Sequence, residues 1–172
     1  MRSMRARRLL RGAAIIFVAG AARTASAQLR VGTRAPEIDL KTFAGERVKL
    51  SGFRGKPVVL TIWATWCPSC RAEFPELSAL YRRLHKDGLE ALAVNERDQE
   101  TSDADVQKFL AEYAPPFPVV IDTRGSSRRA YELIGLPTTV FIDSAGVIRG
   151  FHSGPLRAEE LRAGVALILQ AK

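Results

Sequence analysis

The only two cysteines of this 172-residue chain, Cys67 and Cys70, lie three positions apart in the stretch WATWCPSC at 63–70. An apolar run (58–64) precedes them and a helical stripe of apolar residues follows, so the pattern predicts them at the start of a helix. The unpaired N–H groups and partial positive charge there stabilise a thiolate, lowering a cysteine pKa from about 8.5 to roughly 3.5–7.5. We therefore expect a redox-active pair. Cys67 is the exposed nucleophile, and Cys70, one turn further in, resolves the mixed disulfide.

Two other uses of the cysteines are a purely structural disulfide and half of a metal site. A disulfide that closes so short a loop restricts the unfolded chain very little, which disfavours the structural role. A metal site needs further ligands, and beyond residue 27 the chain offers only His85 and His152, since both methionines precede that point. Both histidines are interpreted as ordinary surface or structural residues. We expect no metal site and no bound cofactor.

The elements that would position the cysteines can be located from the periodicity of apolar residues. An alternating pattern over residues 35–50 predicts a β-hairpin at the front of the domain. Further strands are predicted at 58–64, 89–94, 119–121, 138–142 and 147–151. Helices are predicted directly after the cysteines and at 101–113, 128–134 and 158–169. The first of these helices contains Pro75, and we expect one kinked helix rather than two.

Strands and helices therefore alternate along most of the chain, and the order ends with two consecutive strands and a helix. This order is typical of an α/β fold with a mixed central sheet flanked by helices. No linker or repeat divides the chain, so residues 28–172 are predicted to form one domain.

The basic character of the chain comes mostly from its first 27 residues, which contain six arginines and no acidic residue. Without them the 26 basic and 18 acidic residues become 20 and 18, and the net charge falls from +8 to +2. A basic segment, an apolar segment and the A-x-A sequence at 25–27 predict a signal peptide over residues 1–27 that is cleaved before Gln28. The near-neutral remainder predicts no nucleic-acid partner.

The location expected from this leader is periplasmic or otherwise extracytoplasmic, with no stable membrane insertion after cleavage. The alternative is an uncleaved membrane anchor. It is disfavoured because the apolar run is about half of the roughly 20 residues that span a bilayer.

Four motifs together resemble the thioredoxin superfamily, and more closely its exported TlpA/ResA/DsbE-like branch. They are WATWCPSCRAEFPEL at 63–77, LAVN at 92–95, FPVVID at 117–122 and GLPTTVFID at 135–143. The resemblance covers residues 35–169 and implies a thioredoxin-like fold with a central insert at about 96–114. It also implies Cys67 as the attacking thiol, Cys70 as the resolving thiol, and Pro137 as a cis-proline that faces them.

The resemblance also implies a buried acid near the cysteines. In cytosolic-type thioredoxins an aspartate stands six residues before the first cysteine, where this chain has Thr61. The exported branch carries an acid after the next strand instead, which points to Asp98, with Glu96 as the rival. Such a carboxylate would accept the proton of Cys70. Glu73 fits the branch's WCxxCxxExP pattern, but it is interpreted as a surface charge of the helix, as is Arg71.

The leading hypothesis is an exported thiol–disulfide oxidoreductase that acts as a specific reductant of protein disulfides. The resemblance suggests apocytochrome c or another extracytoplasmic protein as the client. A membrane electron donor with its own thiols would re-reduce the pair, because the compartment is oxidising.

Other hypotheses are an oxidant that inserts disulfides and a copper-handling thiol protein. A peroxiredoxin-like peroxidase is disfavoured, because Ala64 stands where such an enzyme would carry Thr or Ser.

Overall fold

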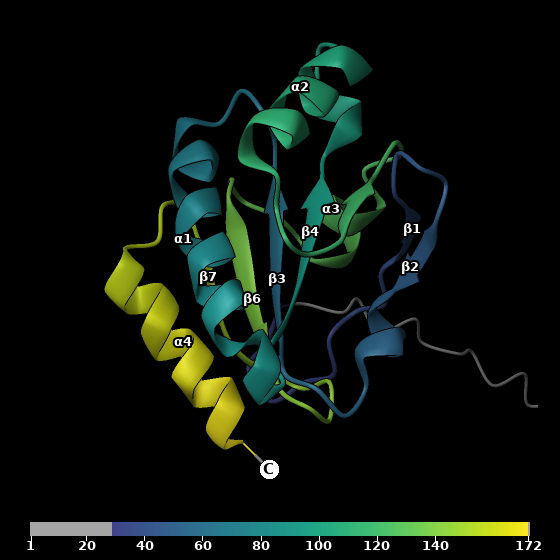
Figure 1. Cartoon of the computed structure of the whole chain (residues 1–172). Coiled ribbons are helices and arrows are strands. Elements are labelled where there is room, and N and C mark those ends of the chain that lie inside the picture. The colour runs from purple at the N-terminus through teal and green to yellow at the C-terminus, as the bar shows by residue number, and fades with distance from the viewer. Residues whose placement is uncertain (1–28, 172) are drawn as a thin grey trace, which may run out of the picture.

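The computed structural model describes residues 29–171, so the predicted signal peptide (1–27) and its cleavage site lie outside the described residues. Within 29–171, a single mixed sheet is flanked by helices on both faces (Figure 1). The strands are β1 (Asp39–Lys41), β2 (Arg47–Lys49), β3 (Val58–Trp63), β4 (Glu90–Asn95), β5 (Val119–Ile121), β6 (Thr138–Ile142) and β7 (Ile148–Ser153). The helices are α1 (Pro68–Leu84), α2 (Asp103–Tyr113), α3 (Ser126–Ala130) and α4 (Ala158–Gln170), with short 3-10 turns η1 (Leu50–Phe53), η2 (His85–Asp87) and η3 (Arg97–Gln99).

The sheet has the strand order β2-β1-β5-β4-β3-β6-β7. Strands β3, β4 and β5 run parallel, whereas β6 pairs antiparallel with both β3 and β7, and β1 pairs antiparallel with both β2 and β5. The carboxyl ends of β3 and β4 and the start of β6 therefore meet at one edge of the sheet. The α/β fold with a mixed central sheet and an N-terminal hairpin is confirmed.

Strand β3 separates two layers of apolar side chains. Val59 and Trp63 point into the layer that contains the buried faces of α1, α2 and α4. Val58, Leu60 and Ile62 point the other way, into a layer with Tyr131 and the chain before β1. This alternation follows from the period of two in a strand. It explains why a strand buried on both faces is a continuous apolar run.

Helix α1 is one continuous helix with Pro75 inside it, as predicted. Its side chains Phe74 and Leu77 are buried, and Phe74 packs edge-on against Trp63 at 4.7 Å between ring centroids. The ring of Phe109 from α2 completes this aromatic group, 4.4 Å from Trp63. The predicted insert therefore packs directly on the helix that carries the cysteines.

The helix predicted at 128–134 is displaced: α3 begins at Ser126 and ends at Ala130. The Asp122 carboxylate accepts hydrogen bonds from the Ser127 N–H, at 2.6 Å, and from the Ser126 hydroxyl, at 3.0 Å, which draws the helix start toward β5. At the other end, Glu132 adopts a left-handed conformation with a φ of 46°, which no helix continues through. The last strand also differs slightly, since β7 ends at Ser153 rather than at 151.

Within residues 29–171, no helix has both the length and the apolar character that crossing a bilayer requires. Helices α1 and α4 lie side by side on one face of the sheet (Figure 1). Helix α4 is held there by its buried face, which includes Leu161, Val165 and Ile168.

A close approach between α4 and β6 yields a prediction about stability. A Cβ at Gly164 would lie 2.3 Å from Cζ of the buried Phe141 ring. Gly→Ala inside a helix normally stabilises by about 1 kcal/mol. Overpacking a core costs about 1–3 kcal/mol. We expect Gly164→Ala to lower the free energy of unfolding by up to about 2 kcal/mol, measured by urea denaturation.

The exposed neighbour Ala163 supplies a control, since Ala163→Gly should cost about 1 kcal/mol through helix propensity alone. Adding Phe141→Leu to Gly164→Ala should recover part of the loss, because the shorter side chain leaves room for the new methyl group. A Gly164→Ala protein that is more stable than the parent would contradict the steric explanation.

Candidate active site

The site begins where β3 ends and α1 starts. The chain turns through Ala64, whose carbonyl accepts a hydrogen bond from the Cys67 N–H at 3.3 Å. Cys67 is the N-cap of α1, and its Sγ accepts a hydrogen bond from the Cys70 N–H at 3.1 Å. Pro68 occupies the first helical position, where its missing N–H has no intrahelical partner to lose. A disulfide joins Cys67 to Cys70, with their Cα atoms 5.2 Å apart.

The exposure of the two cysteines differs from the prediction. Cys67 is the more exposed of the pair, but it is only 3% exposed, against 1% for Cys70. The expectation of a clearly exposed Cys67 is therefore wrong for this disulfide form. The exposed side chain beside the disulfide is instead that of the preceding residue, Trp66, which is 56% exposed. Its indole N–H donates a hydrogen bond to the Gln99 carbonyl at 2.9 Å.

The strand register brings two more loops to the cysteines. Asn95, the last residue of β4, pairs with Trp63, so the loop after β4 lies beside the turn that leads to Cys67. Thr138 pairs with Ile62, so the loop before β6 lies at the same edge. That loop contains Pro137, and its Leu136–Pro137 peptide bond is cis.

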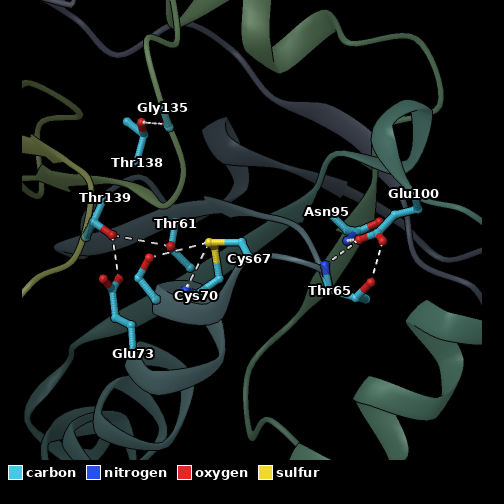
Figure 2. Close-up of a disulfide and its surroundings, with 11 residues drawn as sticks. Thr61, Thr65, Cys67, Cys70, Glu73, Asn95, Glu100, Gly135, Thr138 and Thr139 are labelled. Carbon is cyan, nitrogen blue, oxygen red and sulfur yellow. Dashed lines mark hydrogen bonds between the residues drawn. A yellow bond between two sulfur atoms is a disulfide. The ribbon is translucent and has the colours of Figure 1, made fainter.

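Glu73 is buried, at 5% exposed, and the interpretation of it as a surface charge is wrong. Its Oε1 accepts a hydrogen bond from the Thr139 hydroxyl at 2.6 Å, and Thr139 in turn lies 3.3 Å from the Thr61 hydroxyl (Figure 2). Thr61 is the position at which cytosolic-type thioredoxins carry their acid. Here a carboxylate from α1 reaches the hydroxyl groups of β3 and β6 instead. Arg71 does lie at the surface, where it pairs with Glu112 at 3.2 Å.

Burial raises the pKa of Glu73 above its ordinary value, and hydrogen bonds from Thr139 and the Leu156 backbone offset only part of this effect. The charge of His152 lowers the pKa slightly. The second oxygen, Oε2, is buried and makes no hydrogen bond of good geometry within residues 29–171. The site therefore holds a buried carboxyl group with a raised pKa, one helical turn from Cys70.

A second buried carboxylate, Glu100, lies on the other side of the disulfide (Figure 2). Its Oε1 accepts hydrogen bonds from the Thr65 N–H at 2.6 Å and from the Asn95 side-chain amide at 2.7 Å. Its Oε2 accepts from the Thr65 hydroxyl. Glu100 thus connects the loop after β4 to the turn before Cys67.

The two acids predicted after β4 are both bound by Arg128. Glu96 is buried and accepts hydrogen bonds from Arg128 at 2.8 Å and from the Ser127 hydroxyl at 2.6 Å. Asp98 is partly exposed and accepts two hydrogen bonds from the same guanidinium group, at 2.7 and 2.8 Å. The structure brings both acids to the edge of the sheet that carries the cysteines, within one ion-pair cluster.

A groove of about 240 Å³ opens next to the cysteines, between Trp66 and the loop before β6. Its apolar lining includes Leu133, Leu136 and the 91% exposed Ile134, and Arg128 supplies a charge. Among residues 29–171, including this groove, no group of three or more His, Cys, Asp or Glu side chains is placed to hold a metal ion.

Two site residues were missed by sequence reasoning, Glu73 and Glu100. The WCxxCxxExP pattern was a usable signal for Glu73, because a helix position at that spacing faces the sheet. Glu100 has no such signal, since only the pairing of β3 with β4 brings it to Thr65.

The comparisons with known proteins agree with this geometry. The model of the AhpC/TSA family matches residues 31–151. The thioredoxin-like protein YneN of Bacillus subtilis is 37% identical over 133 residues, 77% of each chain. The thiol-disulfide oxidoreductase ResA of Geobacillus kaustophilus is 36% identical over 138 residues, 80% of this chain and 78% of the relative. The crystal structure of a thiol:disulfide interchange protein DsbE from Chlorobium tepidum superposes with a TM-score of 0.75 at 33% identity, covering 82% of this chain and 99% of that one.

The burial of Glu73 predicts a pH-dependent stability. Its pKa in the folded state is raised above the value of about 4.5 in the unfolded state, so the folded protein binds the proton more tightly. The resulting stabilisation is fully present below pH about 4.5 and is lost as the pH rises through the folded-state pKa. Glutamine does not titrate, so the Glu73→Gln variant does not lose this stabilisation as the pH rises. The difference in free energy of unfolding between the variant and the parent, measured by chemical denaturation, should therefore shift in favour of the variant from pH 4 to pH 7.

The exposed Glu76 on the same helix provides the control. Glu76→Gln should follow the pH dependence of the parent. A Glu73→Gln variant whose stability difference from the parent is the same at pH 4 and pH 7 would show that Glu73 does not titrate as its burial requires.

Proposed function

We propose that this chain, which belongs to the AhpC/TSA family and is a thiol–disulfide oxidoreductase of the thioredoxin superfamily, acts as an exported reductant of disulfides in protein clients. The observation that carries the thiol–disulfide exchange is the hydrogen bond from the Cys70 N–H to Cys67 Sγ at the N-terminus of α1. In the reduced protein this N–H and the positive end of the helix would stabilise a thiolate on Cys67. The reducing direction is proposed from the resemblance to the exported branch.

The reaction follows from the order of the two sulfurs. The Cys67 thiolate attacks one sulfur of a client disulfide, and the client's other sulfur leaves as a thiolate that takes up a proton. Cys70 then loses its proton and attacks Cys67 Sγ, which forms the Cys67–Cys70 disulfide and releases the second client thiol. Two electrons pass to the client, and the protein ends in the disulfide form described above.

The attack by Cys70 needs a proton acceptor, and Glu73 has suitable properties. It lies three residues after Cys70 on the same helix, so both side chains are on neighbouring positions of one face. It is buried and forms no ion pair with any residue in 29–171, and its raised pKa brings it closer to the operating pH, as a general base requires. Asp98 and Glu96 remain the alternatives predicted from the sequence, although Arg128 binds both of them.

The groove beside Trp66 supports a polypeptide client. Its apolar lining and the exposed Ile134 side chain fit apolar residues near a client cysteine in an extended or unfolded segment. Pro137 belongs to the loop before β6, which borders the same groove through Leu136. We propose that this loop faces the client during the exchange.

The leader over residues 1–27 supports export, and an oxidising compartment would require an external dithiol donor to restore the pair. Membrane-bound thiol proteins are the donors proposed here, and apocytochrome c is the proposed client by resemblance to the exported branch. Equilibration with glutathione distinguishes the reduction of clients from the opposite direction, disulfide insertion. A potential below about −200 mV supports the reductant, and one near −120 mV supports the oxidant.

The roles of the two cysteines can be tested with single substitutions. Cys67→Ala should abolish reduction of insulin disulfides, because the attacking sulfur is lost. Cys70→Ala should retain the first attack and accumulate mixed disulfides, which non-reducing gels of the exported compartment would reveal. A Cys67→Ala protein that still reduces insulin would overturn the assignment.

The proton acceptor can be tested by following release of the mixed disulfide in a single turnover at neutral pH. Glu73→Gln should slow release roughly a hundredfold, the lower range for loss of a general base. Glu96→Gln and Asp98→Asn are the matched controls and should leave the release rate nearly unchanged. If either control slows release and Glu73→Gln does not, the acceptor is the acid after β4.

A further inference from the structure

The carboxylate of Glu100 is placed to influence Cys67 although it touches neither sulfur. It is 8% exposed and lies just after η3, at the start of the insert. All three groups that contact its oxygens are hydrogen-bond donors: the Thr65 N–H, the Thr65 hydroxyl and the Asn95 amide. Donors alone are the surroundings that suit an ionised carboxylate.

No ion pair among residues 29–171 includes the Glu100 side chain. Its neighbour Arg97 points a guanidinium N–H at the Glu100 backbone carbonyl, 3.3 Å away, and pairs with Asp103 instead. Among the described residues the carboxylate is therefore solvated by neutral dipoles and forms no ion pair.

Thr65 is only two residues before Cys67, and two residues span at most about 7 Å. The Glu100 carboxylate, at hydrogen-bond distance from Thr65, thus lies on the order of 10 Å from the sulfur. It is also shielded from solvent, which weakens screening by water and salt. A negative charge at that separation opposes the formation of a second negative charge on Cys67.

The same contacts hold the turn in place. Glu100 binds Thr65 through its backbone and its hydroxyl, and the adjacent Gln99 carbonyl binds the Trp66 indole. Both residues that directly precede Cys67 are thus tethered to the loop after β4. This arrangement fixes the distance between the carboxylate and the N-cap of α1.

We propose that Glu100 is a positioning residue whose charge opposes the Cys67 thiolate and so makes the dithiol a stronger reductant. Disulfide exchange is biased toward oxidation of a client when the reduced form is stabilised through its thiolate. The N–H at the start of α1 provides such stabilisation, and the Glu100 charge counteracts it. The proposal rests on the proposed function only in its choice of the reducing direction as the useful one.

Other charged groups also lie near the cysteines. The Arg128 cluster contains two carboxylates and one guanidinium group, and Glu73 lies on the opposite side of the disulfide, within reach of the charge of His152. The charged or titratable groups around the cysteines are Glu73, His152, Glu96, Arg97, Asp98, Glu100, Asp103 and Arg128. Of these, Glu100 is the one that binds the turn leading directly to Cys67.

The test compares Glu100→Gln with the parent, because Gln keeps the shape and one acceptor oxygen while removing the charge. Two quantities are measured on the purified protein: the pH profile of Cys67 alkylation by iodoacetamide, and the equilibrium of the pair with glutathione. The alkylation midpoint should move to lower pH. The redox equilibrium should shift roughly threefold to tenfold toward the dithiol, as expected for a charge at this separation near a protein surface.

Two control variants separate charge from other effects. Glu90 is also buried, but it stands at the first residue of β4, at the opposite end of the sheet. Glu90→Gln should leave both measurements unchanged. Thr65→Val removes one hydrogen bond to Glu100 and keeps its charge, so it should move both quantities less than Glu100→Gln does.

Three results would overturn the proposal. They are an unchanged or upward alkylation midpoint in a folded Glu100→Gln protein, an equal shift in Glu90→Gln, and an equal shift in Thr65→Val. Thermal unfolding of each variant verifies that it folds. Neither measurement involves a client, so failure of this proposal leaves the proposed reductase function standing. Conversely, if the Cys67→Ala experiment showed that the reductase assignment is wrong, the glutathione equilibrium measured for Glu100→Gln would still stand.

Discussion

The hydrogen bond between the Cys70 N–H and Cys67 Sγ is the interaction on which the rest of the site depends. It exists because a strand buried on both faces ends at Trp63 and a helix begins five residues later, at Pro68. A sulfur atom at the N-cap takes the place of the usual side-chain oxygen and satisfies one of the N–H groups that a helix start leaves unpaired. The Cys70 N–H is thus capped by the Cys67 sulfur in the disulfide form, and in the dithiol form the same N–H would stabilise a thiolate on Cys67.

Two buried carboxyl groups lie on either side of this interaction, and their surroundings assign them different chemistry. Glu73 has one good hydrogen bond and one unsatisfied oxygen, so desolvation dominates and raises its pKa. Glu100 is surrounded by three donors that satisfy its charge. Position along the chain would not distinguish them, whereas the number and kind of partners does.

The parts of the fold that sequence reasoning predicts correctly are those with local signals. The buried strand β3, the single helix α1 and the pairing of the cysteines all follow from residue types within about twenty positions. The errors arise where distant residues decide the outcome. Thr139, whose hydroxyl donates a hydrogen bond to Glu73, is 66 positions away from it, and Thr65 is 35 positions from Glu100. The start of α3 likewise depends on hydrogen bonds that the Asp122 side chain accepts, which the apolar periodicity does not encode.

The buried acid Glu73 belongs to helix α1 and not to a strand, which affects how it moves relative to the cysteines. In a protein whose acid stands on the strand, any tilt of the first helix changes the separation between acid and thiols. Here Glu73, Cys67 and Cys70 all belong to α1 or to its cap, so they move as one rigid body. The Glu73 carboxyl group meets the sheet at the hydroxyl groups of β3 and β6, where Thr139 donates a single hydrogen bond to it. A tilt of the helix as a rigid body would change this contact and leave the spacing between Glu73 and the two sulfurs unchanged.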